Sequence, residues 1–129
     1  MPEAERLVLI ADDDLGVRDA LKFALGLEGL DVHVHGAGEE LLADADLCRA
    51  ACVILDDGMP KMDGFELLRR LRAANRRLPA IMLTNHATDG VRARAGAAGV
   101  HLLLEKPLLD TALVDNILSL VRAGAAAGA

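Results

Sequence analysis

Short apolar runs alternate with amphipathic helical patterns along almost the whole chain, and this alternation limits the fold more than any other feature. Strands joined through helices by short connections predict a parallel sheet covered on both faces. Two runs, LVLIA and ACVIL, are apolar at every position, as expected for strands buried on both sides. With right-handed crossovers, this predicts a three-layer α/β domain. The expected strands are Arg6–Ala11, Asp31–His35, Ala51–Leu55, Pro79–Thr84 and His101–Leu104.

The segments between these strands have the apolar spacing of helices with one buried face. One helix is expected behind Asp63, a good N-cap residue, and another around Leu113 and Ile117. Glu39–Arg49 and Thr88–Ala98 are expected to be helical as well, and the arginines from Arg69 to Arg77 are expected to form a solvated helix face. The clearest pattern ends at Gly29, a plausible helix stop, and its apolar positions are Val17, Ala20, Leu21, Ala24 and Leu25.

Composition and charge limit the classes of function. The chain has 129 residues, the usual size of one domain with its own core. Twenty acidic and fourteen basic residues give a net charge of −6, which argues against a surface that contacts nucleic-acid phosphates. With two Phe and neither Tyr nor Trp, the chain also lacks a platform for stacking bases. We therefore expect no direct nucleic-acid binding by this domain.

The cysteines and the N-terminus bear on cellular location. Cys48 and Cys52 lack the spacing of a four-ligand zinc site, and we interpret them as reduced, small apolar residues. The N-terminal residues are acidic where a signal peptide is basic, and no apolar run approaches the ~18 residues of a membrane span. We expect a cytoplasmic protein without membrane contact, with one domain over residues 1–123 and a flexible tail or linker stump over 124–129.

Polar residues follow four of the five expected strands. Because ligands of open parallel sheets collect outside the carboxyl ends of the strands, we expect these residues to converge at one edge. Clustered carboxylates raise one another's pKa values unless a cation neutralises them, and hard oxygen ligands suit Mg²⁺. The residues concerned are Asp12, Asp13 and Asp14 after the first strand, Asp56 and Asp57 at the third, Thr84 at the fourth and Lys106 after the fifth.

Such a cluster has the groups needed for phosphoryl transfer to a carboxylate. A carboxylate can act as a nucleophile and accept a phosphoryl group. The flexible Asp57–Gly58 step can turn a backbone carbonyl toward a metal ion. Thr84 can donate to a phosphate oxygen, and Lys106 can balance its charge. Phosphoryl transfer depends mainly on this kind of positioning and electrostatics.

In these motifs the chain resembles the receiver domain of two-component response regulators. The matching stretches are IADDD, ILDDGMPKMDGFELL, MLT and EKP, in order and at the expected separations, between Arg6 and Arg122. The resemblance implies a doubly wound, flavodoxin-like α/β fold with a five-stranded parallel sheet in the order 2-1-3-4-5. It also implies that the Lys106–Pro107 bond is cis, as is common in the family.

The resemblance implies roles for the site residues as well. Asp56 would be the phosphoacceptor, and Thr84 and Lys106 would contact the phosphoryl group. Mg²⁺ would be held by Asp13, Asp56 and the main-chain oxygen of Gly58, with Asp12 assisting through water. The donor would be a sensor histidine kinase or a histidine phosphotransfer protein. The domain would catalyse its own phosphorylation and dephosphorylation, but it would act primarily as a signalling switch, with a downstream effector that the sequence does not identify.

Two positions depart from the pattern of the family. Leu103 stands three residues before Lys106, where the family usually has a Tyr or Phe that swings inward on activation. Asn85 follows Thr84, where a small Ala or Ser is common. We therefore expect the conformational response to depend on Thr84 and Lys106 more than on the side chain at position 103.

Other interpretations of the same residues stay open. The run Asp12–Asp14 could be only a helix N-terminus, which we accept for Asp14, and Asp56–Gly58 could be only a turn. His33 and His35 could share one side of their strand and bind a metal, although polar residues of an edge strand are the simpler interpretation. The main alternative function is an aspartyl-phosphate hydrolase of the haloacid dehalogenase type. Those enzymes usually have a carboxylate two residues after the nucleophile, where this chain has Gly58.

Overall fold

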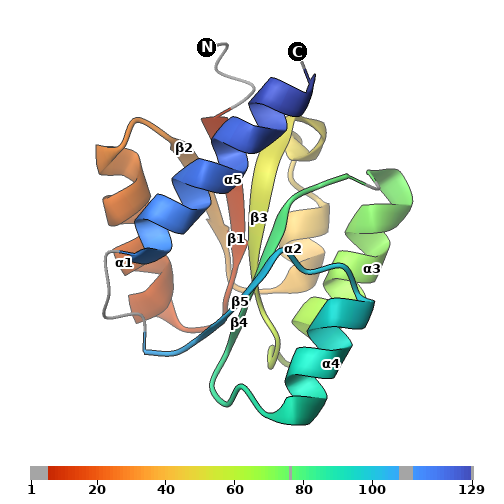
Figure 1. The fold of residues 1–129 in the computed structure, drawn as a ribbon. Helices are drawn as coiled ribbons and strands as arrows, with labels where there is room; N and C mark the ends of the chain where they lie inside the picture. Colours follow the sequence, from red (N-terminus) through yellow and green to blue (C-terminus); the bar gives the residue numbers. More distant parts are fainter. Residues whose placement is uncertain (1–5, 76, 108–111, 129) are drawn as a thin grey trace.

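The computed structural model describes residues 6–75, 77–107 and 112–128. One parallel sheet contains its five strands in the order β2-β1-β3-β4-β5 (Figure 1). This confirms the predicted sheet and strand order, and each strand boundary lies within one residue of the prediction. The strands are β1 (Leu7–Ala11), β2 (Asp31–His35), β3 (Ala50–Asp56), β4 (Ala80–Thr84) and β5 (Leu102–Glu105).

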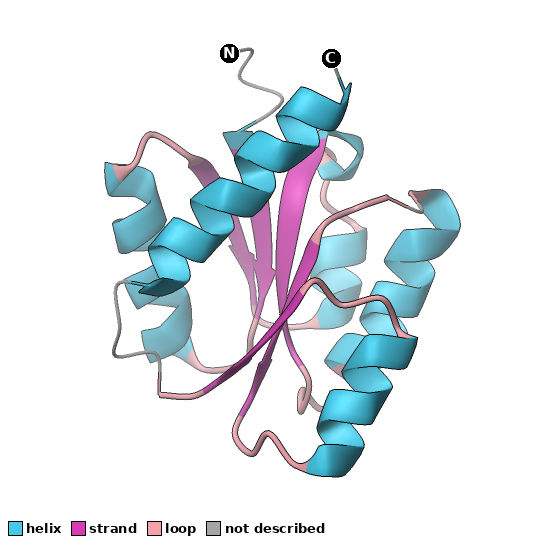
Figure 2. Cartoon of the chain, in the orientation of Figure 1, coloured by secondary structure: helices cyan, strands magenta, loops and turns pink. Residues whose placement is uncertain are grey.

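Helices cover both faces of this sheet (Figures 1 and 2). One face is covered by α1 (Leu15–Leu27) and α5 (Ala112–Gly128), whose apolar residues share a core cluster. The other face is covered by α2 (Gly38–Leu42), α3 (Gly64–Ala74) and α4 (Asp89–Ala97). The predicted three-layer, doubly wound arrangement is confirmed.

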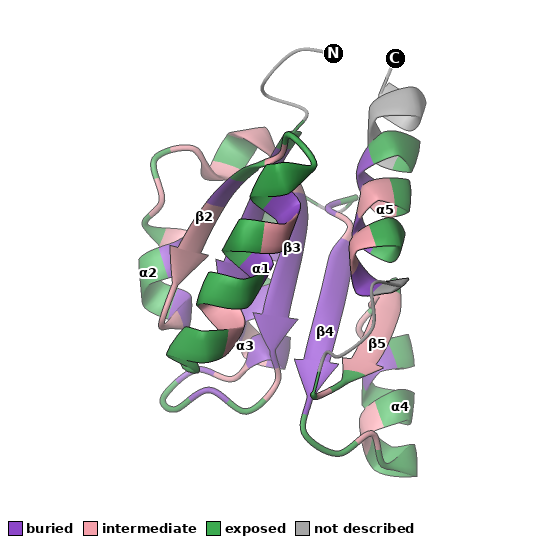
Figure 3. Cartoon of the chain, turned by 90° about the vertical axis from the view of Figure 1, so that its left-hand side faces the viewer, coloured by how far each residue is buried: buried purple, intermediate pink, exposed green. Residues whose placement is uncertain are grey.

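The central strands supply alternate residues to the two core clusters. In β1, Val8 and Ile10 pack toward α1 and α5, whereas Leu7 and Leu9 pack toward α2 and α3. Every residue of β1 and β4 is buried, and the two outer strands β2 and β5 are more exposed (Figure 3). Burial on both sides explains why these runs are continuously apolar rather than alternating.

Three helices begin at a side chain that accepts a hydrogen bond from the first turn. The caps are Asp14, Asp63 and Thr88, and their oxygens lie 3.2, 2.8 and 3.1 Å from the amide nitrogens of Val17, Glu66 and Val91. At its other end, α1 stops before Gly29, whose φ of 83° is open to glycine without strain. Asp14 is thus a helix cap, as expected, and it does not belong to the acidic cluster described below.

The helix expected over Glu39–Arg49 is a misprediction. The α-helix α2 ends at Leu42, and only a single 3₁₀ turn, η2 (Leu47–Arg49), follows. Between them the Asp44 side chain accepts a hydrogen bond from the Asp46 amide at 2.8 Å. An aspartate that bonds to nearby backbone in this way competes with helix propagation, so the chain turns at this point.

The C-terminal helix α5 continues to Gly128, so the boundary expected between residues 123 and 124 falls inside it. The division of the chain into a domain and a tail stays a prediction. None of the helices in the described ranges is long and apolar enough to cross a membrane. Both cysteines are free, with Cys52 buried and Cys48 exposed.

Candidate functional site

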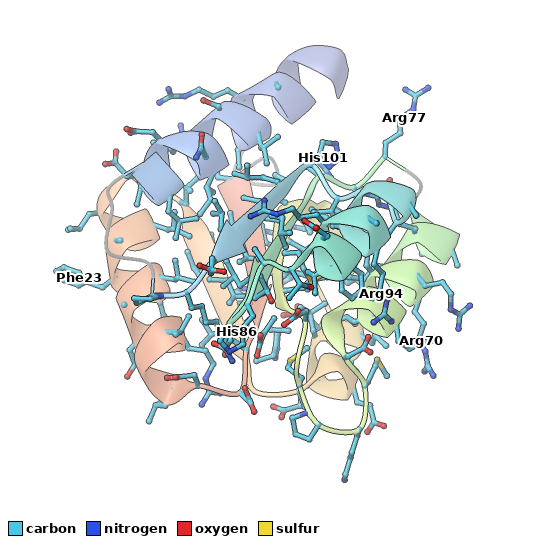
Figure 4. The ribbon with its side chains drawn as sticks, turned by 60° about the horizontal axis from the view of Figure 1, so that its bottom comes forward. Phe23, Arg70, Arg77, His86, Arg94 and His101 are labelled. Atoms are coloured by element: carbon cyan, nitrogen blue, oxygen red, sulfur yellow. The ribbon has the colours of Figure 1, made fainter. Side chains whose placement is uncertain are left out.

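The carboxyl ends of the strands lie together at one edge of the sheet, the edge that comes forward in Figure 4. Asp56 is the last residue of β3 and pairs in register with Leu83 of β4. Thr84 is the last residue of β4 and pairs with Glu105 of β5, directly before Lys106. His86 follows β4 in the loop at the same edge (Figure 4). The parallel register therefore places residues that are distant in sequence next to one another at the carboxyl edge of the sheet.

Three of the predicted site residues are the buried polar or charged residues of the described chain. Asp12 is 0%, Asp56 4% and Thr84 2% exposed. Asp13 is exposed beside them. Carboxylate oxygens of Asp12, Asp13 and Asp56 all lie within 4.8 Å of one another. The predicted acidic cluster is therefore present, with two of its members in the interior.

Lys106 is the counter-ion of this cluster. Its Nζ lies 2.8 Å from Asp12 Oδ2 and 3.5 Å from Asp56 Oδ1. The Lys106 amide donates to the Thr84 carbonyl oxygen at 2.8 Å, and the Lys106–Pro107 bond is cis, as the resemblance implied. Burial opposes the charge on Lys106, but the hydrogen bond and the charges of Asp12 and Asp56 outweigh it and raise its pKa. The ammonium is thus held in the site as a cation.

One cation does not balance three carboxylates. Burial, followed by the charge of Asp12, raises the pKa of Asp56 to about 6, although Lys106 and the Gly58 amide partly oppose this shift. The Gly58 nitrogen lies 3.4 Å from Asp56 Oδ1. A carboxyl with a pKa of about 6 is mostly ionised at neutral pH. An additional positive charge nearby would stabilise this ionised form.

The donor atoms of the cluster fit a hard divalent cation. All three side chains offer carboxylate oxygens, and no imidazole or thiol belongs to the group. Asp12 Oδ2 has no hydrogen-bond donor among the described residues apart from its ion pair with Lys106. Oxygen-only sites of this kind suit Mg²⁺, which takes one or two carboxylates and retains waters. The part expected of the Gly58 main-chain oxygen stays a prediction.

The Thr84 hydroxyl is engaged with its own loop. It donates to the His86 carbonyl oxygen and accepts from the His86 amide, both at 3.2 Å. The next amide, that of Ala87, donates to Glu105 Oε2 at 2.7 Å. A ligand that drew the Thr84 hydroxyl toward Asp56 would have to break the first of these bonds. Hydrogen bonds between Thr84 and His86 therefore join the loop that leads to α4 to the site.

The two departures from the family pattern differ in their surroundings. Leu103 is half-buried and packs against the core cluster under α2, α3 and α4. Asn85 is exposed in the loop after β4. Leu103 therefore already has apolar contacts on the side of the sheet that faces α4.

Gly64 is a site-shaping residue that the sequence interpretation missed. A Cβ on Gly64 would lie 2.8 Å from Met82 Sδ and 2.9 Å from the Asp56 carbonyl carbon, and closer still to the Asp56 carbonyl oxygen. The start of α3 therefore packs directly on the backbone of the residue that carries the central carboxylate. The sequence signal is the Asp63–Gly64 pair, a cap residue followed by a residue without a side chain.

Comparison with known proteins agrees with this geometry. The family described as "Response regulator receiver domain" matches residues 8–118. The transcriptional regulatory protein FixJ of Rhizobium meliloti is 36% identical over 110 residues, which cover 85% of this chain and 54% of FixJ. The transcriptional regulatory protein DctD of Pseudomonas aeruginosa is 36% identical over 117 residues, which cover 89% of this chain and 25% of DctD.

A solved structure supports the same fold. The chemotaxis protein CheY4 of Vibrio cholerae superposes with a TM-score of 0.82 at 28% identity, over 88% of this chain and 97% of that one. CheY4 is thus matched over nearly its whole length. In contrast, the chain spans only about half of FixJ and a quarter of DctD.

Proposed function

The chain belongs to the receiver domain family of two-component response regulators, and from this premise we propose that Asp56 accepts a phosphoryl group from a phosphohistidine. The observation that carries the proposal is the position of Asp56. It is 4% exposed at the end of β3, beside Asp12 and Asp13, and its Oδ1 lies 3.5 Å from the Lys106 ammonium. This is where a nucleophilic carboxylate, counter-charge and metal ligands are needed together.

In the transfer step, an Asp56 carboxylate oxygen attacks phosphorus in line with the bond to the donor imidazole nitrogen. The P–N bond breaks, its electron pair stays on the imidazole, and an aspartyl phosphate forms. Asp56 is mostly ionised above pH 6 and therefore available as the nucleophile. Asp13, Asp56 and the Gly58 main-chain oxygen, with Asp12 assisting through water, would hold Mg²⁺, which would supply positive charge for the phosphoryl oxygens. Lys106 supplies a second positive charge from its position between Asp12 and Asp56.

Phosphorylation acts on conformation through the Thr84 hydroxyl. In the unmodified domain this hydroxyl bonds to the backbone of His86. A phosphoryl oxygen on Asp56 competes for it, and donation to that oxygen releases the loop that ends at the α4 cap, Thr88. The modified state thereby gains contacts that the unmodified state lacks, which is the requirement for a population shift.

The partners follow from this chemistry. The donor is a sensor histidine kinase or a histidine phosphotransfer protein, the partners that membership of the receiver family implies. Dephosphorylation by the domain itself resets the switch. An aspartyl-phosphate hydrolase of the haloacid dehalogenase type is disfavoured, because Gly58 offers no carboxylate to act as general acid and base.

A small phosphodonor tests the proposal. Incubation with acetyl phosphate and Mg²⁺ is expected to add one phosphoryl group, detected by intact mass, and peptide mapping after borohydride reduction is expected to locate it at Asp56. EDTA is expected to suppress the adduct strongly, because the metal supplies charge in the transfer. An adduct on a histidine, or full modification in EDTA, would contradict the proposal.

The conformational response to phosphorylation is expected to depend on the Thr84 side chain more than on the Leu103 side chain. With beryllofluoride as the phosphoryl mimic, Thr84→Ala is expected to lose most of the amide shift changes in α4, because no hydroxyl can leave His86 for the ligand. Leu103→Ala is expected to reduce these changes less, since it removes apolar contacts only. Two-dimensional amide spectra with and without the mimic provide the measurement. A near-wild-type response in Thr84→Ala, with a lost response in Leu103→Ala, would reverse the assignment.

A further inference from the structure

A second group of metal-ligating side chains lies away from the Asp56 site, between the outer strand β2 and the segment after α2. His33 and His35 are two residues apart on β2, so their side chains share one face of the strand. Both imidazoles point at the same atom: His33 Nδ1 and His35 Nε2 each lie 2.9 Å from Asp44 Oδ2. Two nitrogen ligands thus converge on one carboxylate oxygen.

The Asp44 carboxylate is held firmly in place. Its Oδ1 accepts the Asp46 amide at 2.8 Å, and its side chain is 8% exposed. Because Oδ1 accepts the Asp46 amide, Oδ2 is the oxygen left to face the two imidazoles.

We propose that His33, His35, Asp44 and Asp46 bind a divalent transition metal, of which Zn²⁺ is the best match. Ligand atoms of His33, Asp44 and Asp46 lie within 4.8 Å of one another. Tetrahedral zinc with bonds of about 2.0–2.1 Å places its ligand atoms roughly 3.4 Å apart. The two N···O separations of 2.9 Å have to open by about half an ångström to admit the ion. His35 contacts Asp44 but lies outside the group of three, so its ring also has to move toward His33 and Asp46 to share the ion.

The surroundings of the group match those of a metal-bound histidine. If His33 binds through Nδ1, its remaining proton is on Nε2, which lies 3.8 Å from Asp31 Oδ2 on the same strand. Metal-ligating histidines commonly donate their second ring N–H to a carboxylate, and Asp31 is near enough to accept this proton after a small movement of either side chain. His35 is fixed through its backbone, because its carbonyl oxygen accepts the Asp12 amide at 3.0 Å.

The two metal sites differ in chemistry. The group around Asp56 is made of carboxylate oxygens and suits Mg²⁺, whereas the group on β2 adds imidazole nitrogen, which suits zinc, copper and nickel. Excess Mg²⁺ should therefore occupy the first site and leave the second free for zinc. This difference allows each site to be measured in the presence of the other.

The test is a zinc titration by calorimetry in excess Mg²⁺, with folding of each variant checked by its amide spectrum. The wild type is expected to bind one equivalent. His33→Gln and His35→Gln are each expected to weaken binding at least about tenfold, and Asp31→Asn by a smaller factor. Three control variants should bind within about twofold of wild type: Asp13→Asn at the other metal site, Cys48→Ser at the exposed thiol and His86→Ala as a matched surface histidine.

A second measurement identifies the ligand atoms even if one glutamine variant folds poorly. Long-range ¹H–¹⁵N spectra of the zinc-loaded wild type are expected to show metal on Nδ1 of His33 and on Nε2 of His35. The proposal is overturned if the wild type binds no zinc in excess Mg²⁺, or if both glutamine variants keep wild-type affinity. Loss of binding in Asp13→Asn alone would also overturn it, by assigning the zinc to the Asp56 site.

Discussion

Asp56→Asn is expected to abolish the phosphoryl adduct and, without metal, to stabilise the folded protein by roughly 2–3 kcal/mol at neutral pH. The first effect follows because the amide is not a nucleophile for phosphorus. The second follows because Asp56 is buried beside the charge of Asp12, which raises its pKa from 3.8 to about 6. The folded state thus disfavours the charge that the side chain carries at neutral pH.

The sign of the pH dependence makes this prediction specific. Between pH 4 and 6 the folded state binds the Asp56 proton more tightly than the unfolded state does. The contribution of Asp56 to the free energy of unfolding therefore falls as the pH rises through that window, and the loss is nearly complete at about pH 7. The difference in unfolding free energy between Asp56→Asn and wild type should be small at pH 4 and largest at pH 7.5, as measured by urea denaturation in EDTA.

Asp57→Asn is the matched control, since it removes the adjacent carboxylate, which is outside the acidic cluster. It is expected to keep the adduct and to change stability by less than about 0.5 kcal/mol. Addition of Mg²⁺ should narrow the gap between wild type and Asp56→Asn, because the wild type gains more from the metal. A phosphoryl adduct that persists in Asp56→Asn would disprove Asp56 as the phosphoacceptor. If Asp56→Asn were less stable than wild type without metal, the acidic cluster would not carry an unfavourable excess of negative charge.

The fold and the convergence of the site residues could be predicted because both depend on local pattern and parallel topology. Continuous apolar runs identified β1 and β3, and once the strands are parallel their carboxyl ends must meet. The cap residue Asp63 and the acidic residue Asp14 indicated the starts of two helices, because a cap acts within its own first turn.

What could not be predicted depends on partners distant in sequence. The helix expected over Glu39–Arg49 is interrupted at Asp44, which is held by imidazoles nine and eleven residues earlier in the chain. Arg72 was expected to be a solvated charge, but it donates to the carbonyl oxygens of Leu78 at 3.2 Å and Gly99 at 2.9 Å. No local pattern contains these contacts, because they arise only when separate elements pack.

Gly64 is the clearest such case, and its replacement leads to the second prediction. Gly64→Ala is expected to destabilise the protein by about 3 kcal/mol, the upper part of the range for overpacking a core. The new Cβ would lie 2.9 Å from the Asp56 carbonyl carbon and 2.8 Å from Met82 Sδ. The Met82 side chain can move aside, but the backbone of β3 is fixed by its pairing with β1 and β4.

Gly26→Ala is the matched control, because Gly26 is also helical and a Cβ there would meet nothing within 4 Å. It is expected to be neutral or to stabilise the fold by about 0.5–1 kcal/mol, the usual gain of alanine over glycine in a helix. Unfolding by urea compares the two variants directly. Equal stability of Gly64→Ala and Gly26→Ala would show that α3 can move away from β3 at little cost.

The same substitution is expected to impair the site as well as the fold. In Gly64→Ala the new Cβ would clash with the backbone of Asp56, and relieving this clash requires the start of α3 or the end of β3 to shift. Asp56 is the last residue of β3 and would move with it. Its Oδ1 would then leave the 3.5 Å contact with Lys106, and the three carboxylates would lose their common geometry. Gly64→Ala should therefore take up acetyl phosphate more slowly than Gly26→Ala under conditions where both are folded. Equal rates, together with the expected loss of stability, would mean that the packing of α3 supports the fold without positioning the carboxylate.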